Sequence, residues 1–152
     1  MVSFRQMRGK VRIGGFHAHH LIPKQISEHR HFAQFIGNLR GAGLDLDDFE
    51  ENGMHLSCTE QLAEIFQLPV HRGAHPRYNA LVADQVGKLE NLPIHDALLG
   101  IRSLQCSLRS GLRYAGPEMI QGLRNPMASE FERDLDSIGL LSDRRARIVR
   151  VS

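Results

Sequence analysis

Residues 16–23 read FHAHHLIP, a run that holds three histidines, His17, His19 and His20. Bounded by a glycine pair on one side and by Pro23 on the other, the run predicts a short strand or one arm of a hairpin. Adjacent residues of a strand point to opposite faces, so His19 and His20 cannot easily share one metal ion. One of them can bind a metal while the other faces a substrate, which predicts one ligand and one base.

The rest of the chain predicts helices joined by turns. Amphipathic spacing predicts a helix over residues 24–43 that carries His29 and His31 as surface or packing residues. A strand is expected after the NG turn at 52–53. Further helices are expected at 59–68, from 76 to about 91, at about 94–112 and at 126–141. The predicted fold class is α+β, a mostly helical single domain with one small antiparallel piece.

Two local signals place the ends of these helices. Ser57 and Glu60 have the spacing of a capping box for the helix at 59–68. Pro76 fits the first turn of the next helix, which puts His75 near its N-cap. The leucines expected inside the helix at about 94–112 are Leu98, Leu99, Leu104, Leu108 and Leu112.

Composition indicates an ordinary soluble domain that spans residues 1–152, with 41% hydrophobic and 24% charged residues. No apolar run approaches the roughly 20 residues of a membrane span, and no Sec signal peptide is visible. The two cysteines, Cys58 and Cys106, are expected to be buried free thiols. The net charge is only +2, but basic residues gather near both ends and acids in residues 41–66. That pattern fits a basic working face, and equally a patchwork of solvated surfaces.

Four of the nine histidines form two tight groups, His19-His20 and His71-x-x-x-His75, with Asn52 between them in the sequence. Divalent transition metals bind imidazole nitrogens, and catalytic sites use about three protein ligands with one position left open. Each group alone is more simply explained by chance or packing. The two groups together with Asn52, all next to turns, favour a functional site.

The segments AHHLIP, NGMHL and HRGAHPRYNALV, in this order, resemble the AHH nucleases of the HNH/endonuclease VII superfamily. These nucleases are often toxin modules of bacterial polymorphic toxins. The resemblance covers about residues 16–90 and continues more weakly through the following leucine-rich helix. It implies a ββα-metal finger, in which a hairpin and a helix clamp one metal ion. The motif core would span about 16–90, and a helical C-terminal extension about 94–152.

The resemblance also implies residue roles. His19 and His75 would be metal ligands, and His71 the third ligand. His20 would be the general base, and Asn52, or a backbone carbonyl beside it, would hold the base's ring. In the simplest family pattern two ligands lie one turn apart on one helix, whereas here the helix is expected to start after His71. Two further histidines, at positions 17 and 55, match no family role.

Phosphodiester hydrolysis needs an activated water and stabilisation of the phosphate charge. Histidine can take a proton from water near neutral pH, which suits the role of His20. One divalent ion, Zn, Ni, Mg or Mn, would act as a Lewis acid. The basic residues nearest in sequence are Arg72, Arg77 and Lys24. Arg77 is favoured, because arginine offers a fork of donors to a phosphate. No base-reading signature is present, so little sequence specificity is expected.

The function predicted from the sequence is that of a metal-dependent endonuclease, the toxin domain of a bacterial effector, that cuts DNA and leaves RNA open as a target. It would be secreted or delivered by a contact-dependent system into a target cell, and an immunity protein would accompany it. One alternative is a non-catalytic nucleic-acid-binding module with a structural metal. Structural zinc sites are closed by four protein ligands, and the motif offers no obvious fourth ligand. A second alternative is a helical interaction protein whose histidines are accidental.

Overall fold

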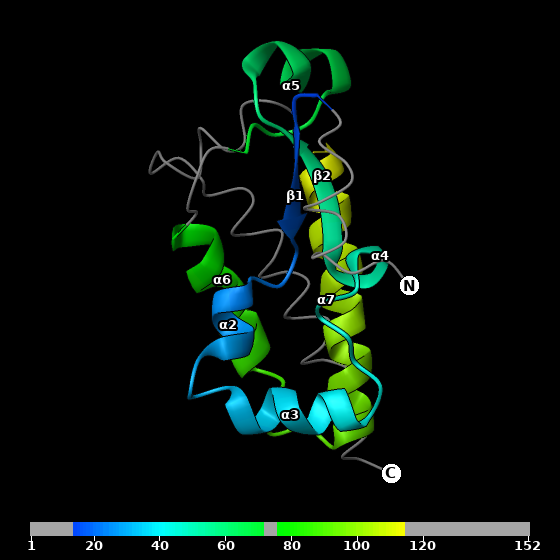
Figure 1. Cartoon of the computed structure of the whole chain (residues 1–152). Helices are drawn as coiled ribbons and strands as arrows, with labels where there is room; N and C mark the ends of the chain where they lie inside the picture. The colour runs from blue at the N-terminus through cyan, green and yellow to red at the C-terminus, as the bar shows by residue number, and fades with distance from the viewer. Residues whose placement is uncertain (1–13, 72–75, 115–152) are drawn as a thin grey trace.

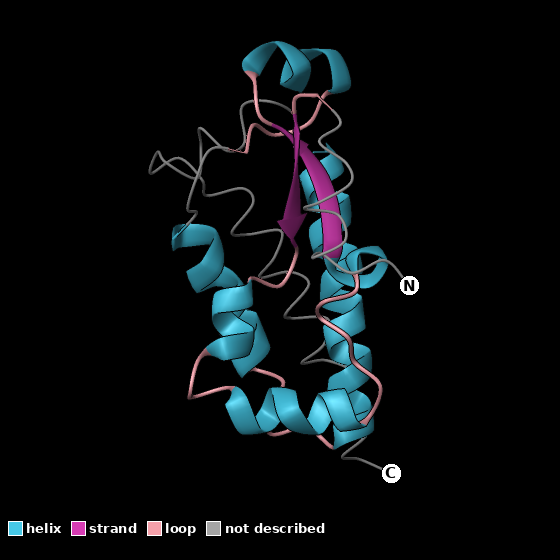
Figure 2. Cartoon of the chain, viewed as in Figure 1, coloured by secondary structure: helices cyan, strands magenta, loops and turns pink. Residues whose placement is uncertain are grey.

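The computed structural model describes residues 14–71 and 76–114 of the chain. Its only strands within these residues form a two-stranded antiparallel sheet, β1 (Phe16–His20) and β2 (Gly53–Ser57), surrounded by helices (Figure 2). The register pairs His19 with Met54 and His20 with Gly53. The fold class is therefore α+β, as predicted.

Strand β1 is enclosed by turns at both ends. Gly15 precedes it with a φ of +91°, and a Cβ at this position would lie 2.0 Å from Cδ1 of Leu62. Only glycine suits both the backbone conformation and the lack of space. Beyond the strand, Leu21 and Ile22 are completely buried, and Pro23 is the N-cap of the first helix.

The single helix predicted over 24–43 is wrong, because the segment forms two helices, α2 (Lys24–Glu28) and α3 (Ala33–Gly41). His29 ends α2 in an extended conformation, with φ −72° and ψ 129°. In one straight helix, Ile26 and Phe32 would point about 120° apart, since successive residues turn by about 100°. The break between the helices lets both side chains enter the same core. His29 and His31 consequently lie in an exposed turn and not on a helix.

A four-residue helix, α4 (Phe49–Asn52), leads into β2 and was not expected. Its N-cap is Asp48, whose carboxylate accepts a hydrogen bond from Glu50 N (3.0 Å). Helix α5 (Glu60–Phe66) is capped by Thr59, whose hydroxyl accepts from Leu62 N (3.3 Å). The predicted capping box is thus wrong: Ser57 is fully buried at the end of β2, two residues too early to cap.

Helices α6 (Pro76–Gly87) and α7 (Ile94–Tyr114) complete the described fold. Helix α6 begins at Pro76 as predicted. Along α7, Leu99 is 53% exposed and contradicts its expected burial. It lies about 100° around the helix from Leu98, outside the buried stripe. The residues that α7 does bury are Ala97, Leu98, Ile101, Leu104, Gln105, Leu108 and Leu112.

Helices flank the two-stranded sheet on two sides (Figure 1). Helices α2 and α6 contact each other beside β1, whereas α7 runs the length of the molecule beside β2 and contacts α4 and α3. Between them lies one core that includes Ile22, Ile36, Leu56, Val82 and Ile101. The two-stranded sheet is thus packed on both sides, and its strand ends are held by residues from distant parts of the chain.

Several predicted features lie outside the described residues: the basic segments at 1–13 and 144–150, the residues Arg72 and His75, and the helix at 126–141. Within 14–71 and 76–114, no helix has the length and apolar character needed to cross a membrane. The two cysteines are both free, as expected, but neither is buried: Cys58 is half-buried and Cys106 is exposed.

Candidate metal and catalytic site

The antiparallel register separates the two neighbouring histidines of β1. Residues directly opposite each other in such a pair share a face of the sheet, so His19 lies on the face of its partner Met54. His17, two residues earlier, lies on the same face, whereas His20 lies on the other. His19 is 8% exposed, and His17 is exposed. The predicted division of the pair between two faces is therefore present.

His71 is brought to this face by a short parallel bridge between Val70 and Ser57. Its backbone N–H donates to Ser57 O (2.6 Å). Its ring centroid lies 5.1 Å from that of His19 and 5.7 Å from that of His17. The structure thus joins two of the three predicted ligands, although they are 52 positions apart in the sequence.

The spacing of these rings suits a shared metal ion. Two imidazoles bound to one tetrahedral ion at about 2 Å per bond have ring centroids about 5 Å apart, close to the distance between His19 and His71. Within the described residues, no group of three or more histidines, cysteines or carboxylates is close enough to hold an ion. The third predicted ligand, His75, is not among those residues. The described residues therefore supply two of the three predicted metal ligands, His19 and His71.

Tyr78 on α6 closes the same face from the helix side. Its ring centroid is 5.2 Å from that of His19, and its hydroxyl donates to Leu21 O (2.6 Å). Burial raises the pKa of the Tyr78 hydroxyl far above its ordinary value, so the group stays a neutral donor. The apolar periodicity of the helix expected from 76 suits burial of Tyr78. No local signal in the sequence indicates that its ring packs against His19.

Asn52 is fully buried, and all four hydrogen-bonding positions of its amide are used. Oδ1 accepts from Ile22 N (2.8 Å) and from Gln105 Nε2 (3.2 Å). Nδ2 donates to Ile22 O (3.1 Å) and to Leu46 O (3.0 Å). An amide can make no more than two bonds at each atom, so nothing remains for the ring of His20. The Asn52 side chain therefore binds the backbone of Ile22, which follows the histidine pair, and not the ring of His20, the predicted base.

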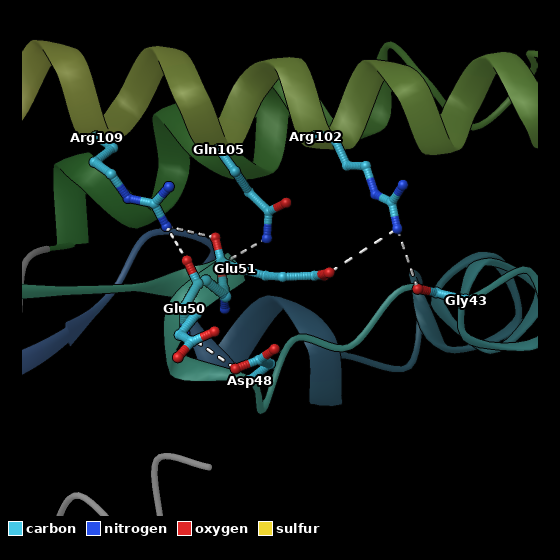
Figure 3. A network of polar contacts seen from close by, with 8 residues as sticks. Gly43, Asp48, Glu50, Glu51, Arg102, Gln105 and Arg109 are labelled. Carbon is cyan, nitrogen blue, oxygen red and sulfur yellow. Dashed lines mark hydrogen bonds and ion pairs between the residues drawn. The ribbon is translucent and has the colours of Figure 1, made fainter. Parts of the chain in front are cut away.

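Helix α7 extends two polar side chains, Gln105 and Arg109, toward α4 (Figure 3). Gln105 bonds the Asn52 amide, and Arg109 Nη2 donates to the carbonyls of Glu50 (2.7 Å) and Glu51 (2.8 Å). Carbonyls at a helix C-terminus lack intrahelical partners, and a cation there also opposes the negative end of the helix dipole. Neither residue was singled out in the sequence. The available signal was the glutamine itself, a polar residue inside the apolar stripe of α7.

His20 is half-buried and lies opposite Gly53. A Cβ at Gly53 would lie 2.4 Å from the carbonyl oxygen of Phe49, so the backbone passes too close for any side chain. His55, one pair further along the same face, packs its ring against Phe49 with centroids 4.8 Å apart. His20 therefore faces a side of the sheet that is shaped by α4, away from the rings of His19 and His71.

The predicted phosphate-binding cations differ in their surroundings. Arg77 is exposed near the start of α6. Lys24 forms an exposed ion pair with Glu28 (3.2 Å) on α2, which partly neutralises it. Within the described residues Arg77 forms no ion pair with a carboxylate, unlike Lys24, and this keeps Arg77 the favoured candidate.

A model of the AHH family, described as a nuclease family of the HNH/ENDO VII superfamily with conserved AHH, matches residues 4–93. The match covers well over half of the chain and includes Ala18-His19-His20, Asn52 and His71. It stops one residue before α7 begins. No curated protein and no solved structure matches the chain.

Proposed function

The chain belongs to the AHH nucleases of the HNH/ENDO VII superfamily, and from that membership we propose that it is a metal-dependent endonuclease. Its substrate would be DNA, cut with little sequence preference. The observation that carries the proposal is the pairing of the buried His19 with His71 at a distance suited to one metal ion, while the next residue, His20, lies on the opposite face.

The metal site in this proposal consists of His19, His71 and His75. The ion would stabilise charge on the scissile phosphate as a Lewis acid, and it could be Zn, Ni, Mg or Mn. The rings of His19 and His71 come from a strand and from the loop before α6, so binding one ion would tie these two elements together. Arg77 would contact a phosphate oxygen, since it is exposed at the start of the helix that follows His75.

His20 is proposed as the general base that takes a proton from the attacking water. Its backbone is held in the ladder with β2, and the two residues that follow it are completely buried. Asn52 contributes by fixing those two residues through Ile22 N and Ile22 O. In this proposal Asn52 positions the strand end that carries His20, in place of the direct contact with its ring that the sequence suggested.

The test is a comparison of plasmid cleavage and bound metal on the same samples. Wild-type protein is expected to hold about one divalent ion and to cleave plasmid, and EDTA is expected to abolish cleavage. His20→Ala should keep the ion and lose cleavage, whereas His19→Ala should lose both, together with thermal stability. If His20→Ala loses the ion while His19→Ala keeps it, the two roles are exchanged. If wild-type protein neither binds an ion nor cleaves, the proposal is wrong.

A second candidate function is a metal-stabilised binding module without catalysis, and the position of His17 favours it. With His17 5.7 Å from His71, four histidines could surround the ion and close its coordination. His17→Ala separates the two. A structural site would lose metal affinity in this variant, whereas an enzyme with three ligands would keep both its ion and its cleavage rate.

The biological setting is proposed to be that of a toxin delivered into a bacterial cell and neutralised by an immunity protein. Expression in a bacterial cytoplasm should then stop growth and degrade the chromosome. RNA is the other possible target, and total RNA from the same cells distinguishes it. Healthy cells with intact nucleic acid, at confirmed expression of folded protein, would contradict the toxin role. The partner would present acidic groups, since charge complementarity speeds association with a basic face.

A further inference from the structure

Helix α7 lies entirely beyond the segment that the nuclease family model covers, yet it contacts Asn52 directly. We propose that Gln105 on α7 is a positioning residue for the reaction: through Asn52 it fixes the strand end that carries His19 and His20. The inference rests on the proposed function for the reaction that is positioned. The hydrogen bonds that run from Gln105 through the Asn52 amide to Ile22 form a relay. This relay is independent of that function and can be measured separately.

The relay ends at two residues whose backbone is held completely. Leu21 N donates to Asn52 O (2.8 Å), and Leu21 O accepts from the Tyr78 hydroxyl (2.6 Å). Ile22 N and Ile22 O bond the two ends of the Asn52 amide. All four backbone polar groups immediately after His20 thus depend on two side chains, those of Asn52 and Tyr78, and on one carbonyl. A shift of the Asn52 amide is transmitted to the histidine pair without an intervening flexible residue.

Gln105 sets the orientation of that amide. It is 3% exposed and lies among Ile101, Leu104 and Leu108 on the buried stripe of α7. A polar group in such a place is costly unless it is hydrogen-bonded. Its Nε2 donates to Asn52 Oδ1 and completes the fourth bond of the amide. Without this donor, the amide keeps three of its four bonds and Oδ1 is held by Ile22 N alone, so the geometry that serves both Ile22 groups is less firmly fixed.

Arg109 fixes the backbone on which Asn52 sits. One turn further along α7, it holds the carbonyls of Glu50 and Glu51 (Figure 3). Gly53 O lies 3.4 Å from the same guanidinium nitrogen. The carbonyl groups on both sides of Asn52 are therefore tied to the same helix as its amide. Gln105 acts on a residue whose main chain cannot move away to compensate. Small displacements of reacting groups are expensive, and about 1 Å can cost about 100-fold in rate.

Two substitutions remove the bond in opposite ways. Gln105→Met keeps the length and volume of the side chain but has no donor. Gln105→Asn keeps the amide but is one methylene too short to reach Asn52. Gln85→Met is the matched control, since Gln85 is also a buried helical glutamine (7% exposed). Its side chain bonds the adjacent Asp84 (3.4 Å) and, within residues 14–71 and 76–114, none of the groups at the strand end.

Amide hydrogen exchange and steady-state cleavage are measured on wild type and the three variants. Both Gln105 variants should speed hydrogen exchange of the Ile22 amide by about 10-fold relative to exchange of the Ile36 amide. Ile36 lies in α3, and its N–H donates to Phe32 O, so it serves as the reference. The kcat should fall by about 10- to 100-fold with KM within about 2-fold, because substrate binding does not use the relay. Gln85→Met should change neither the exchange rate of Ile22 relative to Ile36 nor kcat.

The outcomes separate positioning from simple stability. Equal acceleration at Ile22 and Ile36 would mean that Gln105 only stabilises the fold, and wild-type kcat in either Gln105 variant would overturn the positioning role. Selective acceleration at Ile22 together with a loss of kcat supports it. A wild-type protein that does not cleave nucleic acid overturns the proposed function instead, and the exchange ratio then still reports whether Gln105 holds the strand end.

Discussion

Two segments of the chain are rich in histidine, and they differ in almost everything else. The strand segment holds His19 and His20 in a ladder of five pairs, followed by two completely buried residues. The turn segment between α2 and α3 holds His29 and His31, both exposed. Its contacts include a bond from His31 N to His29 Nδ1 (3.2 Å), an ion pair of His31 with Glu90 (3.4 Å) and packing of both rings against Phe32.

The difference lies in how each imidazole is supported. The strand segment receives bonds from α4 and from α6, and α7 in turn supports α4, whereas the turn segment relies on its own neighbours and one half-buried carboxylate, that of Glu90. A group that must hold a metal or move a proton needs a fixed position, which only a well-supported backbone gives. Histidine content alone therefore does not distinguish the two segments, whereas the convergence of distant helices on one strand end does.

The largest expected contrast is in cleavage rate between matched alanine substitutions in the two segments. His20→Ala should reduce kcat by about 10²- to 10⁴-fold, the usual cost of losing a general base. His29→Ala should cleave plasmid at nearly the wild-type rate, since its side chain is exposed and outside the site. Equal rates for the two variants would remove the distinction between the segments.

The next contrast concerns stability at the support of the strand segment. Asn52→Ala leaves two backbone groups of Ile22, the carbonyl of Leu46 and the amide of Gln105 without this partner. Each buried polar group left unsatisfied costs about 1–3 kcal/mol, and partial relaxation should limit the total loss of unfolding free energy to about 2–4 kcal/mol. Urea unfolding measures it.

A half-buried asparagine near the surface, Asn79, provides the control for that experiment. Asn79 donates to Gln25 on the surface between α6 and α2 (3.0 Å), so Asn79→Ala should change the unfolding free energy by less than about 0.5 kcal/mol. If both asparagine variants lose the same stability, the burial of Asn52 does not have the energetic weight assigned to it.

A smaller effect is expected from the second side chain that holds the strand end. Tyr78→Phe removes the hydroxyl that donates to Leu21 O and should cost about 1–2 kcal/mol of unfolding free energy at neutral pH. The exposed Tyr114→Phe should cost nothing measurable.

The pH dependence of this difference follows from the raised pKa of Tyr78. Above about pH 10 the unfolded tyrosine loses its proton while the folded one keeps it, so wild-type stability falls by up to about 1.4 kcal/mol per pH unit. The phenylalanine variant lacks this loss. The advantage of wild type over Tyr78→Phe should therefore shrink as the pH rises past 10, and urea unfolding at pH 8 and pH 10.5 tests it.

The smallest effect is expected in the turn segment. The ion pair of His31 with Glu90 is exposed on the histidine side, and such surface pairs contribute about 0–1 kcal/mol. His31→Ala should lower the unfolding free energy by no more than about 0.5 kcal/mol and leave cleavage unchanged. A loss above 2 kcal/mol would show that this turn has a structural weight comparable to that of the strand end.

Local sequence signals predicted much of the fold. The two strands, the start of α6 at Pro76 and the extent of α7 follow from residue alternation, proline chemistry and apolar periodicity, and the structure confirms them. The turn predicted at Asn52-Gly53 is wrong, because Asn52 ends α4 and Gly53 begins β2. The helix over 24–43 was predicted wrongly because Ile26 and Phe32 each suit a helix, while their joint burial requires a break. Periodicity within one segment does not report where the partner core lies.

The candidate site shows the same limit more sharply. Motif spacing placed His19, His20 and Asn52 in one site, and the structure brings His19 to His71 as expected. The partners of Asn52 lie 30 positions before it and 53 positions after it, and no local pattern can indicate bonds of that range. Gln105 was visible only as a polar residue in an apolar stripe, a signal that does not name its partner.

The 53-residue separation between Asn52 and Gln105 has a consequence for the order of folding during synthesis. The two strands are themselves more than 30 positions apart, so the pairing of β1 with β2 already requires closure of a long loop. The relay to its strand end is completed only after α7 has left the ribosome, since a chain that stops before residue 105 lacks the final donor. A growing polypeptide therefore contains His19 and His20 long before the proposed site is ordered. Assembly of the site is a late event in the life of the nascent chain.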